Sequence, residues 1–142
     1  MDLRIEINEE TLQDIINIET GLLYPLDGFM RERDFRSVID SYTMADGKVF
    51  TIPVTLDVPE CMYDKIESGQ LLELMFREET VAVIEAGDKY QMTDEDIKKV
   101  FGTLEDEHPG VKKEHERSSF RVGGKTKLLK RQLLKETLKP ED

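Results

Sequence analysis

Apolar and polar side chains alternate along several short segments, and this alternation predicts strands that bury one face. The clearest case is residues 49–58 (VFTIPVTLDV), in which five apolar side chains fall on one face. Pro53 has no backbone N–H to donate, so we expect this strand at a sheet edge or across a bulge. A shorter alternation predicts a strand over residues 3–7, and strand-forming residues on both sides of a charged turn predict a hairpin over residues 71–86.

Other segments place apolar residues three and four positions apart, as one face of a helix does. This spacing predicts helices over residues 9–21 and 31–42. A further helix is predicted over residues 93–102, because a threonine can cap its start, an aspartate follows three positions later and a glycine follows its end. Pro109 favours the first turn of another short helix.

Turn residues separate these elements. Residues 86–90 (AGDKY) predict a turn after the hairpin, and Gly123-Gly124 predict a turn between a strand and a further strand or helix. The strands do not alternate with long helices in a βαβ rhythm. We therefore predict an α+β domain with a mixed or barrel-like sheet.

Charge is distributed unevenly along the chain. Residues 1–124 carry 14 Lys and Arg against 28 Asp and Glu, a net charge of −14, whereas residues 125–142 carry 6 against 3, a net charge of +3. We expect the first range to be the domain and the second to be a basic C-terminal tail, or a last strand or helix. The candidate basic residues of this tail are Lys125, Lys127, Lys130 and Arg131.

This charge pattern weighs against nucleic acid as a partner. The acidic domain would repel a phosphate backbone, and only the basic tail could attract one. The plainer interpretation is that the tail is solvated or lies against the acidic domain. Its leucines are spread around the whole helical wheel, which favours packing on two sides and hence self-association or docking to a partner.

Further bulk features bear on the compartment. No apolar run approaches the ~20 residues of a membrane-spanning helix, and the first ten residues lack the basic and apolar parts of a secretion signal. Cys61 is the single cysteine, so no internal disulfide can form and a reducing compartment is expected. Together these features predict a cytoplasmic protein.

Four segments occur in one order along the chain, and they are GLLYPLDGFMRERDFRSVI (21–39), FTIPVTLDV (50–58), VFGTLEDEHPGV (100–111) and FRVGGK (120–125). In series they resemble the N-terminal domain of ATP sulfurylase (sulfate adenylyltransferase). The resemblance implies a PUA-like fold, a pseudo-barrel of mixed or antiparallel strands with short flanking helices. The motif residues that become candidates for an interaction surface are Pro25, Leu26, Gly28, Phe29, Met30, His108, Pro109, Gly110, Gly123 and Gly124.

Residues 21–30 are more apolar than a plain connecting loop. In the family this segment links the first two helices, and we expect its apolar side chains to fold back under the loop as core, with Gly21 and Gly28 permitting the turns. The side chains expected in the core are Tyr24, Leu26, Phe29 and Met30. The alternative is a patch that faces a partner.

The resemblance also says which chemistry to look for. The family joins sulfate to the α-phosphate of ATP and releases pyrophosphate, using cationic and hydrogen-bonding groups that hold two anions in line. Those groups belong to its second domain, which carries Q-x-R-N, H-x-x-H and glycine-arginine motifs. Here no glutamine begins Q-x-R-N, and His108 and His115 are seven positions apart rather than three. We therefore expect the catalytic domain to be absent and no catalysis by this chain alone.

Other chemistry finds no support in the residue pattern. His108, His115 and Cys61 lack the close spacing of a zinc site. The acidic neighbours of Cys61 disfavour a thiolate nucleophile. We predict no catalytic residues, no metal and no cofactor.

Three functions stay open at this point. The first is an accessory or assembly module linked to sulfate activation, whose partner is a separate catalytic protein, as in a split sulfate adenylyltransferase, or a second copy bound through the tail. The second is a small PUA-like RNA-binding module that uses the basic tail, which rests on fold analogy. The third is a small enzyme whose site the sequence does not reveal.

Overall fold

The computed structural model describes residues 3–44, 47, 49–50 and 53–129. In chain order the helices and strands are β1 (Leu3–Glu6), α1 (Glu9–Glu19), β2 (Gly28–Phe29), α2 (Glu32–Ser41), β3 (Leu56–Asp57), α3 (Glu60–Tyr63), β4 (Leu71–Phe76), β5 (Glu79–Gln91), α4 (Asp94–Phe101), α5 (Pro109–Glu116) and β6 (Phe120–Leu128). None of the helices in this part of the chain is long and apolar enough to cross a membrane.

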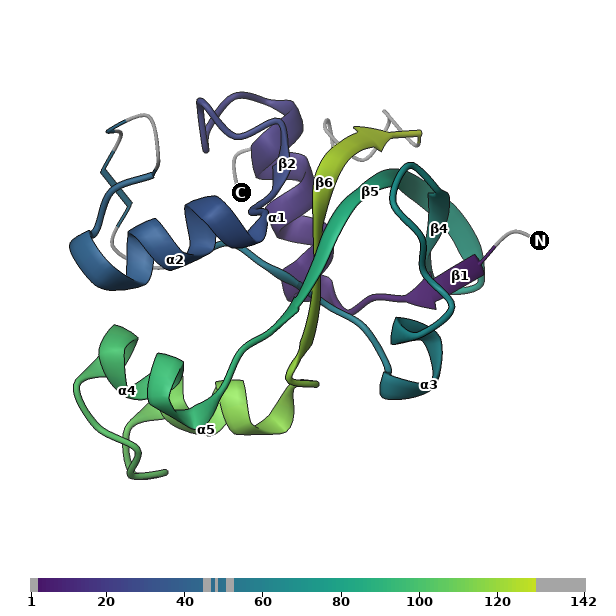
Figure 1. Cartoon of the computed structure of the whole chain (residues 1–142). Coiled ribbons are helices and arrows are strands. Elements are labelled where there is room, and N and C mark those ends of the chain that lie inside the picture. Colours follow the sequence, from purple (N-terminus) through teal and green to yellow (C-terminus); the bar gives the residue numbers. More distant parts are fainter. Residues whose placement is uncertain (1–2, 45–46, 48, 51–52, 130–142) are drawn as a thin grey trace, which may run out of the picture.

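The strands form one mixed sheet. Their order is β1-β4-β5-β6-β2, and β3 also pairs with β6. Only β1 and β4 run parallel among the described pairs, and the others are antiparallel. The order ends at β1 and at β2, so the sheet is not closed, although β5 and β6 curve strongly (Figure 1). This arrangement confirms the predicted α+β class with a mixed sheet.

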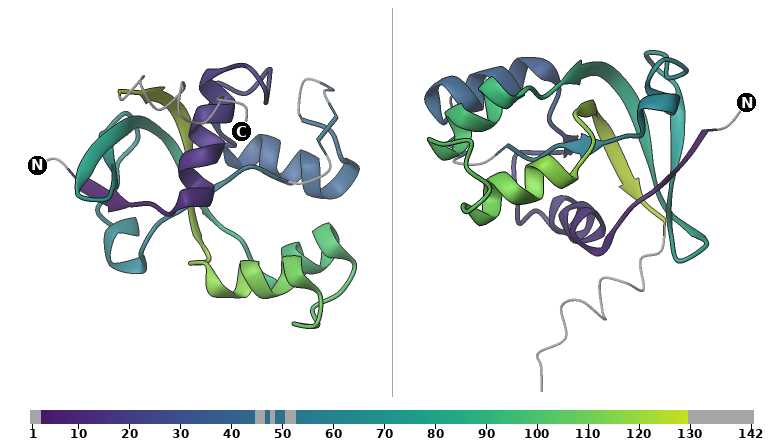
Figure 2. Two further views of the ribbon diagram at one scale, coloured as in Figure 1. Left: turned by 180° about the vertical axis from the view of Figure 1, so that it is seen from behind. Right: turned by 90° about the horizontal axis from the view of Figure 1, so that it is seen from below.

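Two buried clusters stabilise the domain. The first joins α1 to the sheet and includes Ile15, Leu72 and Ile84, each 0 % exposed. The second joins α2, α4 and α5 to the far end of β5 and includes Phe35 and Val111, each 0 % exposed. Figure 1 shows this division, with β1, β4 and α3 on one side and α2, α4 and α5 on the other. The rear view in Figure 2 shows α1 crossing the middle of the molecule beside β6.

Side-chain caps or a proline mark the starts of three helices, and the sequence predicted the signals at α4 and α5. The Asn8 side chain accepts a hydrogen bond from the Thr11 amide at the start of α1. Thr93 and the N3 aspartate form the predicted capping box of α4, and Gly102 ends that helix in the left-handed conformation. Pro109 occupies the first position of α5, as predicted.

The predicted hairpin is also confirmed. Strands β4 and β5 pair antiparallel and are joined at Arg77 and Glu78, which both have positive φ (50° and 67°). Positive φ at both central residues is the geometry of the mirror-image turn that suits the twist of two strands.

The strand predicted over residues 49–58 is wrong for most of the described part of that segment. Only Leu56 and Asp57 pair with β6, because β2 covers the adjoining part of the same edge. Residues 51–52 lie outside the described residues. The predicted burial is confirmed at Leu56, which is 0 % exposed. Thr55, on the face predicted to be polar, is buried as well. The segment runs between the two clusters, and Val54 packs against both.

The turn predicted over residues 86–90 is wrong. Strand β5 continues through this segment, and its pairing with β6 shifts register between Ala86 and Asp88, which makes Gly87 a bulge. A Cβ at Gly87 would lie 2.5 Å from the Arg31 Nε, so the glycine leaves room for the Arg31 side chain next to β5.

The turn predicted at Gly123-Gly124 is also wrong, because β6 continues without a break through both glycines. Both are positions where other backbones come close. A Cβ at Gly124 would lie 2.0 Å from the carbonyl oxygen of Glu85, and one at Gly123 would lie 2.4 Å from that of Met30. Strand β6 also runs across residue 124, where we placed the boundary between domain and tail.

Candidate functional site

Residues 25–30 (PLDGFM) and β6 form the first candidate site, because the fold brings two of the four sequence motifs together here. Gly28 pairs with Lys125 and Phe29 pairs with Gly124. A Cβ at Gly28 would lie 1.8 Å from the carbonyl oxygen of Gly124, so a side chain at this position would clash with the neighbouring strand. Tertiary pairing therefore explains why glycines stand at both positions.

The side chains of this segment do not all point inward. Leu26, Phe29 and Met30 are buried, as predicted. Tyr24 is 76 % exposed, so its predicted place in the core is wrong, and Leu22 beside it is 73 % exposed. The chain turns between α1 and β2, and these two side chains of the turn are exposed. We call Leu22 and Tyr24 the apolar tip.

A groove of about 300 Å³ begins directly after the apolar tip. It is lined by Pro25, Leu26, Asp27, Gly28, Phe29, Met30, Arg31, Asp34, Met44 and Gly124. Six of these residues were candidates from the sequence, and they come from β2, the residues on either side of it, and β6. We call this the motif groove.

The third motif lies elsewhere. His108 precedes α5, where its Nδ1 accepts a hydrogen bond from the Gly110 amide and its ring lies 5.2 Å from the Phe101 ring, centroid to centroid. A Cβ at Gly110 would lie 2.4 Å from Phe101 as well. His108, Pro109 and Gly110 thus join α5 to α4, away from the motif groove. Lys125 and Lys127 are exposed on β6, and Lys130 and Arg131 lie outside the described residues.

Sequence reasoning missed a buried arginine. Arg121 on β6 is 1 % exposed, and all three of its guanidinium nitrogens donate to protein acceptors. Nη1 donates to the Thr55 hydroxyl (2.7 Å), Nη2 to Glu114 (2.9 Å) and Nε to the Ser118 carbonyl (3.0 Å). Burial lowers its pKa, and the neighbouring Arg117 charge lowers it further.

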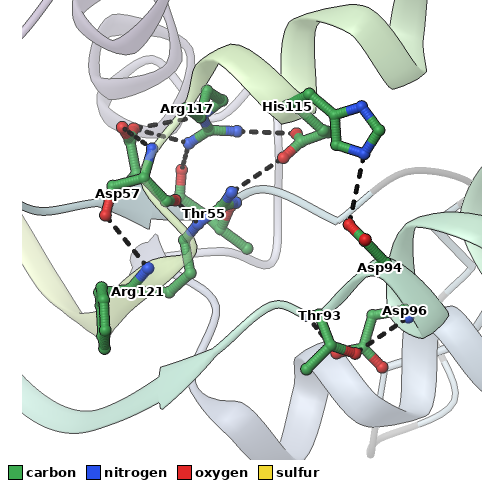
Figure 3. Close-up of polar contacts among 11 residues, drawn as sticks. Thr55, Asp57, Thr93, Asp94, Asp96, His115, Arg117 and Arg121 are labelled. Atoms are coloured by element: carbon green, nitrogen blue, oxygen red, sulfur yellow. Dashed lines mark hydrogen bonds and ion pairs between the residues drawn. The ribbon is translucent and has the colours of Figure 1, made fainter. Parts of the chain in front are cut away.

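A second arginine completes the cluster (Figure 3). Arg117 donates to Asp57 (3.0 Å), to Glu114 (3.0 Å) and to the Thr55 carbonyl (2.8 Å). The cluster of two arginines and two carboxylates thus joins β6, α5 and the β3 segment. Two adjacent arginines would suit sulfate or phosphate, but here the donors are directed at protein oxygens. The arrangement is a structural brace.

A second groove, of about 570 Å³, lies between the start of α1 and α5. Its lining residues are Asn8, Glu9, Glu10, Thr11, Asp14, Asp57, Lys113, Glu116 and Arg117. Burial raises the pKa of Asp14 to about 6, although the Arg117 charge opposes the rise. Lys113 is paired with Glu10 at 2.6 Å. Carboxylates outnumber cations around this groove, so it repels anions such as sulfate and ATP.

Within the described ranges, no group of three or more histidine, cysteine or carboxylate side chains is arranged to hold a metal ion. Cys61 is exposed on α3.

Comparison with known proteins places this geometry in a family. Residues 2–131 match the PUA-like domain family. The chain is 38 % identical to a sulfate adenylyltransferase of Halothermothrix orenii, covering 90 % of this chain and 34 % of the relative. It is 35 % identical to one of Entamoeba histolytica, covering 89 % of this chain and 31 % of the relative. The chain thus spans about a third of the length of the curated relatives it matches.

A solved structure shares the fold. A hexameric APS kinase from Thiobacillus denitrificans superposes with a TM-score of 0.64 at 16 % identity, over 89 % of this chain and 21 % of that one. The family match and the matches to sulfate adenylyltransferases confirm the resemblance drawn from the four sequence segments. The chain belongs to the PUA-like domain family, and is similar to the PUA-like part of sulfate adenylyltransferases.

Proposed function

We propose that this domain is a non-catalytic assembly module of sulfate activation and sulfate assimilation, which docks onto a catalytic sulfate adenylyltransferase domain. The observation that carries the proposal is the extent of the match, since about 90 % of this chain aligns with about a third of each relative. The rest of a relative's length would supply the surface that this domain meets. That surface belongs either to the same chain or to a separate subunit of a split enzyme.

The electrostatics support a role without catalysis. Joining sulfate to ATP brings two anions together, so a catalytic site needs cations that are free to bind them. Residues 1–124 carry a net charge of −14. Arg117 and Arg121 donate to protein oxygens, and the groove beside Arg117 is lined mainly by carboxylates.

The apolar tip supports the docking surface. Leu22 and Tyr24 expose most of their side chains, and the motif groove begins at the next residue, Pro25. Neighbouring exposed apolar side chains mark interaction sites, and tyrosine is among the residues that contribute most to binding. The proposed occupant is an apolar segment of the catalytic domain, which would cover the tip and fill the groove.

RNA binding by the tail has less support. Lys125 and Lys127 are exposed, but β6 places them on a domain whose net charge is strongly negative. Such a domain repels a phosphate backbone.

The test combines binding with turnover. The probe is the catalytic part of the Halothermothrix orenii relative, prepared without its PUA-like part and shown to be folded by circular dichroism. We expect the pure chain to release no pyrophosphate from ATP, magnesium and sulfate or molybdate, and to form a complex with the probe in analytical ultracentrifugation. Replacing both tip residues (Leu22→Ser with Tyr24→Ser) should weaken binding by about tenfold, or roughly 1.4 kcal/mol.

The matched control is Leu104→Ser, which removes an exposed leucine from another face and should leave binding unchanged. Pyrophosphate release by the pure chain would overturn the non-catalytic role. If the tip variant bound the probe as tightly as the unchanged domain does, the proposed docking surface would be overturned, but the assembly role would stand.

A further inference from the structure

His115 on α5 contacts a carboxylate with each of its two ring nitrogens. Nδ1 lies 2.6 Å from Asp106 Oδ1 in the loop before α5. Nε2 lies 3.3 Å from Asp94 Oδ1 at the start of α4, and Figure 3 shows this second contact. The imidazole therefore joins three segments: α4, the loop over residues 102–108, and α5.

This geometry specifies a protonation state. An ionised carboxylate only accepts hydrogen bonds, whereas a neutral imidazole has a single N–H to donate. Both contacts can be hydrogen bonds only when both ring nitrogens carry protons, that is, when His115 is the imidazolium cation. The two carboxylates lie at opposite nitrogens of the ring, so they are not arranged to chelate a metal together with it.

We propose that His115, Asp94 and Asp106 form a proton-operated latch between α4 and α5. With the imidazolium form the latch is closed and both carboxylates are bridged. Loss of the proton leaves one N–H, which stays on Asp106 because that contact is the shorter, and Asp94 is released. The segment between Asp106 and His115 contains the His108-Pro109-Gly110 motif. The structural order of this motif therefore depends on whether His115 is protonated.

The surrounding charges favour the closed form. The hydrogen bond to Asp106, followed by the charges of Asp106 and Asp94, raises the pKa of His115. The charged groups near His115 on its own helix are Lys112, Lys113, Glu114, Glu116 and Arg117. The neighbouring α4 adds Glu95, Asp96, Lys98 and Lys99, and the loop before α5 adds Glu105 and Glu107. Asp14 of α1 lies beside Arg117, and burial raises its pKa to about 6, so it is a second group near this helix that titrates.

The sign of the pH effect follows from linkage. A histidine whose pKa is higher in the folded than in the unfolded state contributes stability below its unfolded value of about 6.5. That contribution is lost as the pH rises through the folded value. The latch therefore opens toward alkaline pH.

The test uses the full chain and two local readouts. Imidazole NMR signals report the titration midpoint of His115 in the natural chain and in each variant. We expect His115 to titrate above the ordinary histidine value of about 6.5, Asp106→Asn to lower its midpoint, and Asp94→Asn to lower it less. Hydrogen exchange at residues 103–110, corrected for intrinsic rates, should become roughly threefold faster as His115 loses its proton.

Two variants separate the latch from general charge effects. Glu107→Gln removes the same charge from the same loop and should move the midpoint of His115 less than Asp106→Asn does. Carrying out the exchange measurement in an Asp14→Asn background removes the titration of Asp14. The proposal would be overturned if neither Asp94→Asn nor Asp106→Asn changed the titration midpoint of His115. It would also be overturned if the hydrogen-exchange rates at residues 103–110 did not change when His115 loses its proton.

Discussion

At the scale of single residues, glycine meets two different structural requirements in this domain. Gly102 ends α4 with a φ of 79°, a conformation that a side chain would strain. Gly28 and Gly124 instead lie in strands, where a Cβ would run into the backbone of a neighbouring strand. The first use depends on local geometry and the second on residues distant in the sequence.

Replacement of Gly124 tests the second use. A Cβ at this position would meet the Glu85 carbonyl oxygen at 2.0 Å, and both groups belong to backbone that cannot move aside cheaply. We expect Gly124→Ala to lower the free energy of unfolding by about 3 kcal/mol or more, measured by urea denaturation.

Gly21→Ala is the matched control. Gly21 has a φ of 85° but open space around its Cα, so the substitution should cost only about 1–2 kcal/mol for the left-handed backbone. Equal losses in the two variants would show that close approach of the strands is not what requires glycine at position 124.

At the scale of elements, α4 combines a local cap with a tertiary contact. Asp96 completes the capping box by accepting from the Thr93 amide at 3.0 Å. The same side chain accepts from Arg36 of α2 at 2.7 Å and is only 6 % exposed. The residue that starts the helix also fixes it against its neighbour.

Two substitutions separate these roles. Thr93→Ala removes one cap hydrogen bond and should cost about 1 kcal/mol of stability. Asp96→Ala removes the other hydrogen bond of the capping box and also leaves Arg36 without this carboxylate, so we expect a loss of about 2–3 kcal/mol. Thermal or urea unfolding of both variants measures the difference, and a loss for Asp96→Ala no larger than for Thr93→Ala would mean that the ion pair contributes nothing.

At the scale of the whole molecule, the arginine cluster ties together segments that are far apart in sequence. Arg121 connects β6 to Glu114 on α5 and to Thr55 before β3. The two buried clusters meet nearby, where Val54 packs against both. The cluster therefore braces the junction between the two halves of the domain.

Removal of Arg121 should destabilise the whole domain. Arg121→Met leaves the partly buried Glu114 with one partner instead of two, and breaking such a buried pair costs about 3–5 kcal/mol. The control is Arg4→Met, because Arg4 is 68 % exposed in its pair with Glu73, and exposed pairs contribute less than about 1 kcal/mol. Similar unfolding midpoints for the two variants would contradict the bracing role.

The sequence by itself determined the features that depend on neighbours along the chain. The capping box at Thr93, the glycine stop at position 102 and the hairpin all rest on contacts between residues a few positions apart. The ordered series of motifs likewise indicated the family before any geometry was known. These signals are local or cumulative, so no knowledge of the fold was needed to interpret them.

Only the tertiary structure decided the rest. Tyr24 is exposed although its segment is apolar, and Thr55 is buried, where its hydroxyl accepts a hydrogen bond from Arg121 of β6. Gly123 and Gly124 continue a strand in which the backbones of Met30 and Glu85 come close. For Thr55 and the two glycines the deciding partners are far away in the sequence. Residue patterns report periodicity and composition, and they do not say which distant groups a fold brings together.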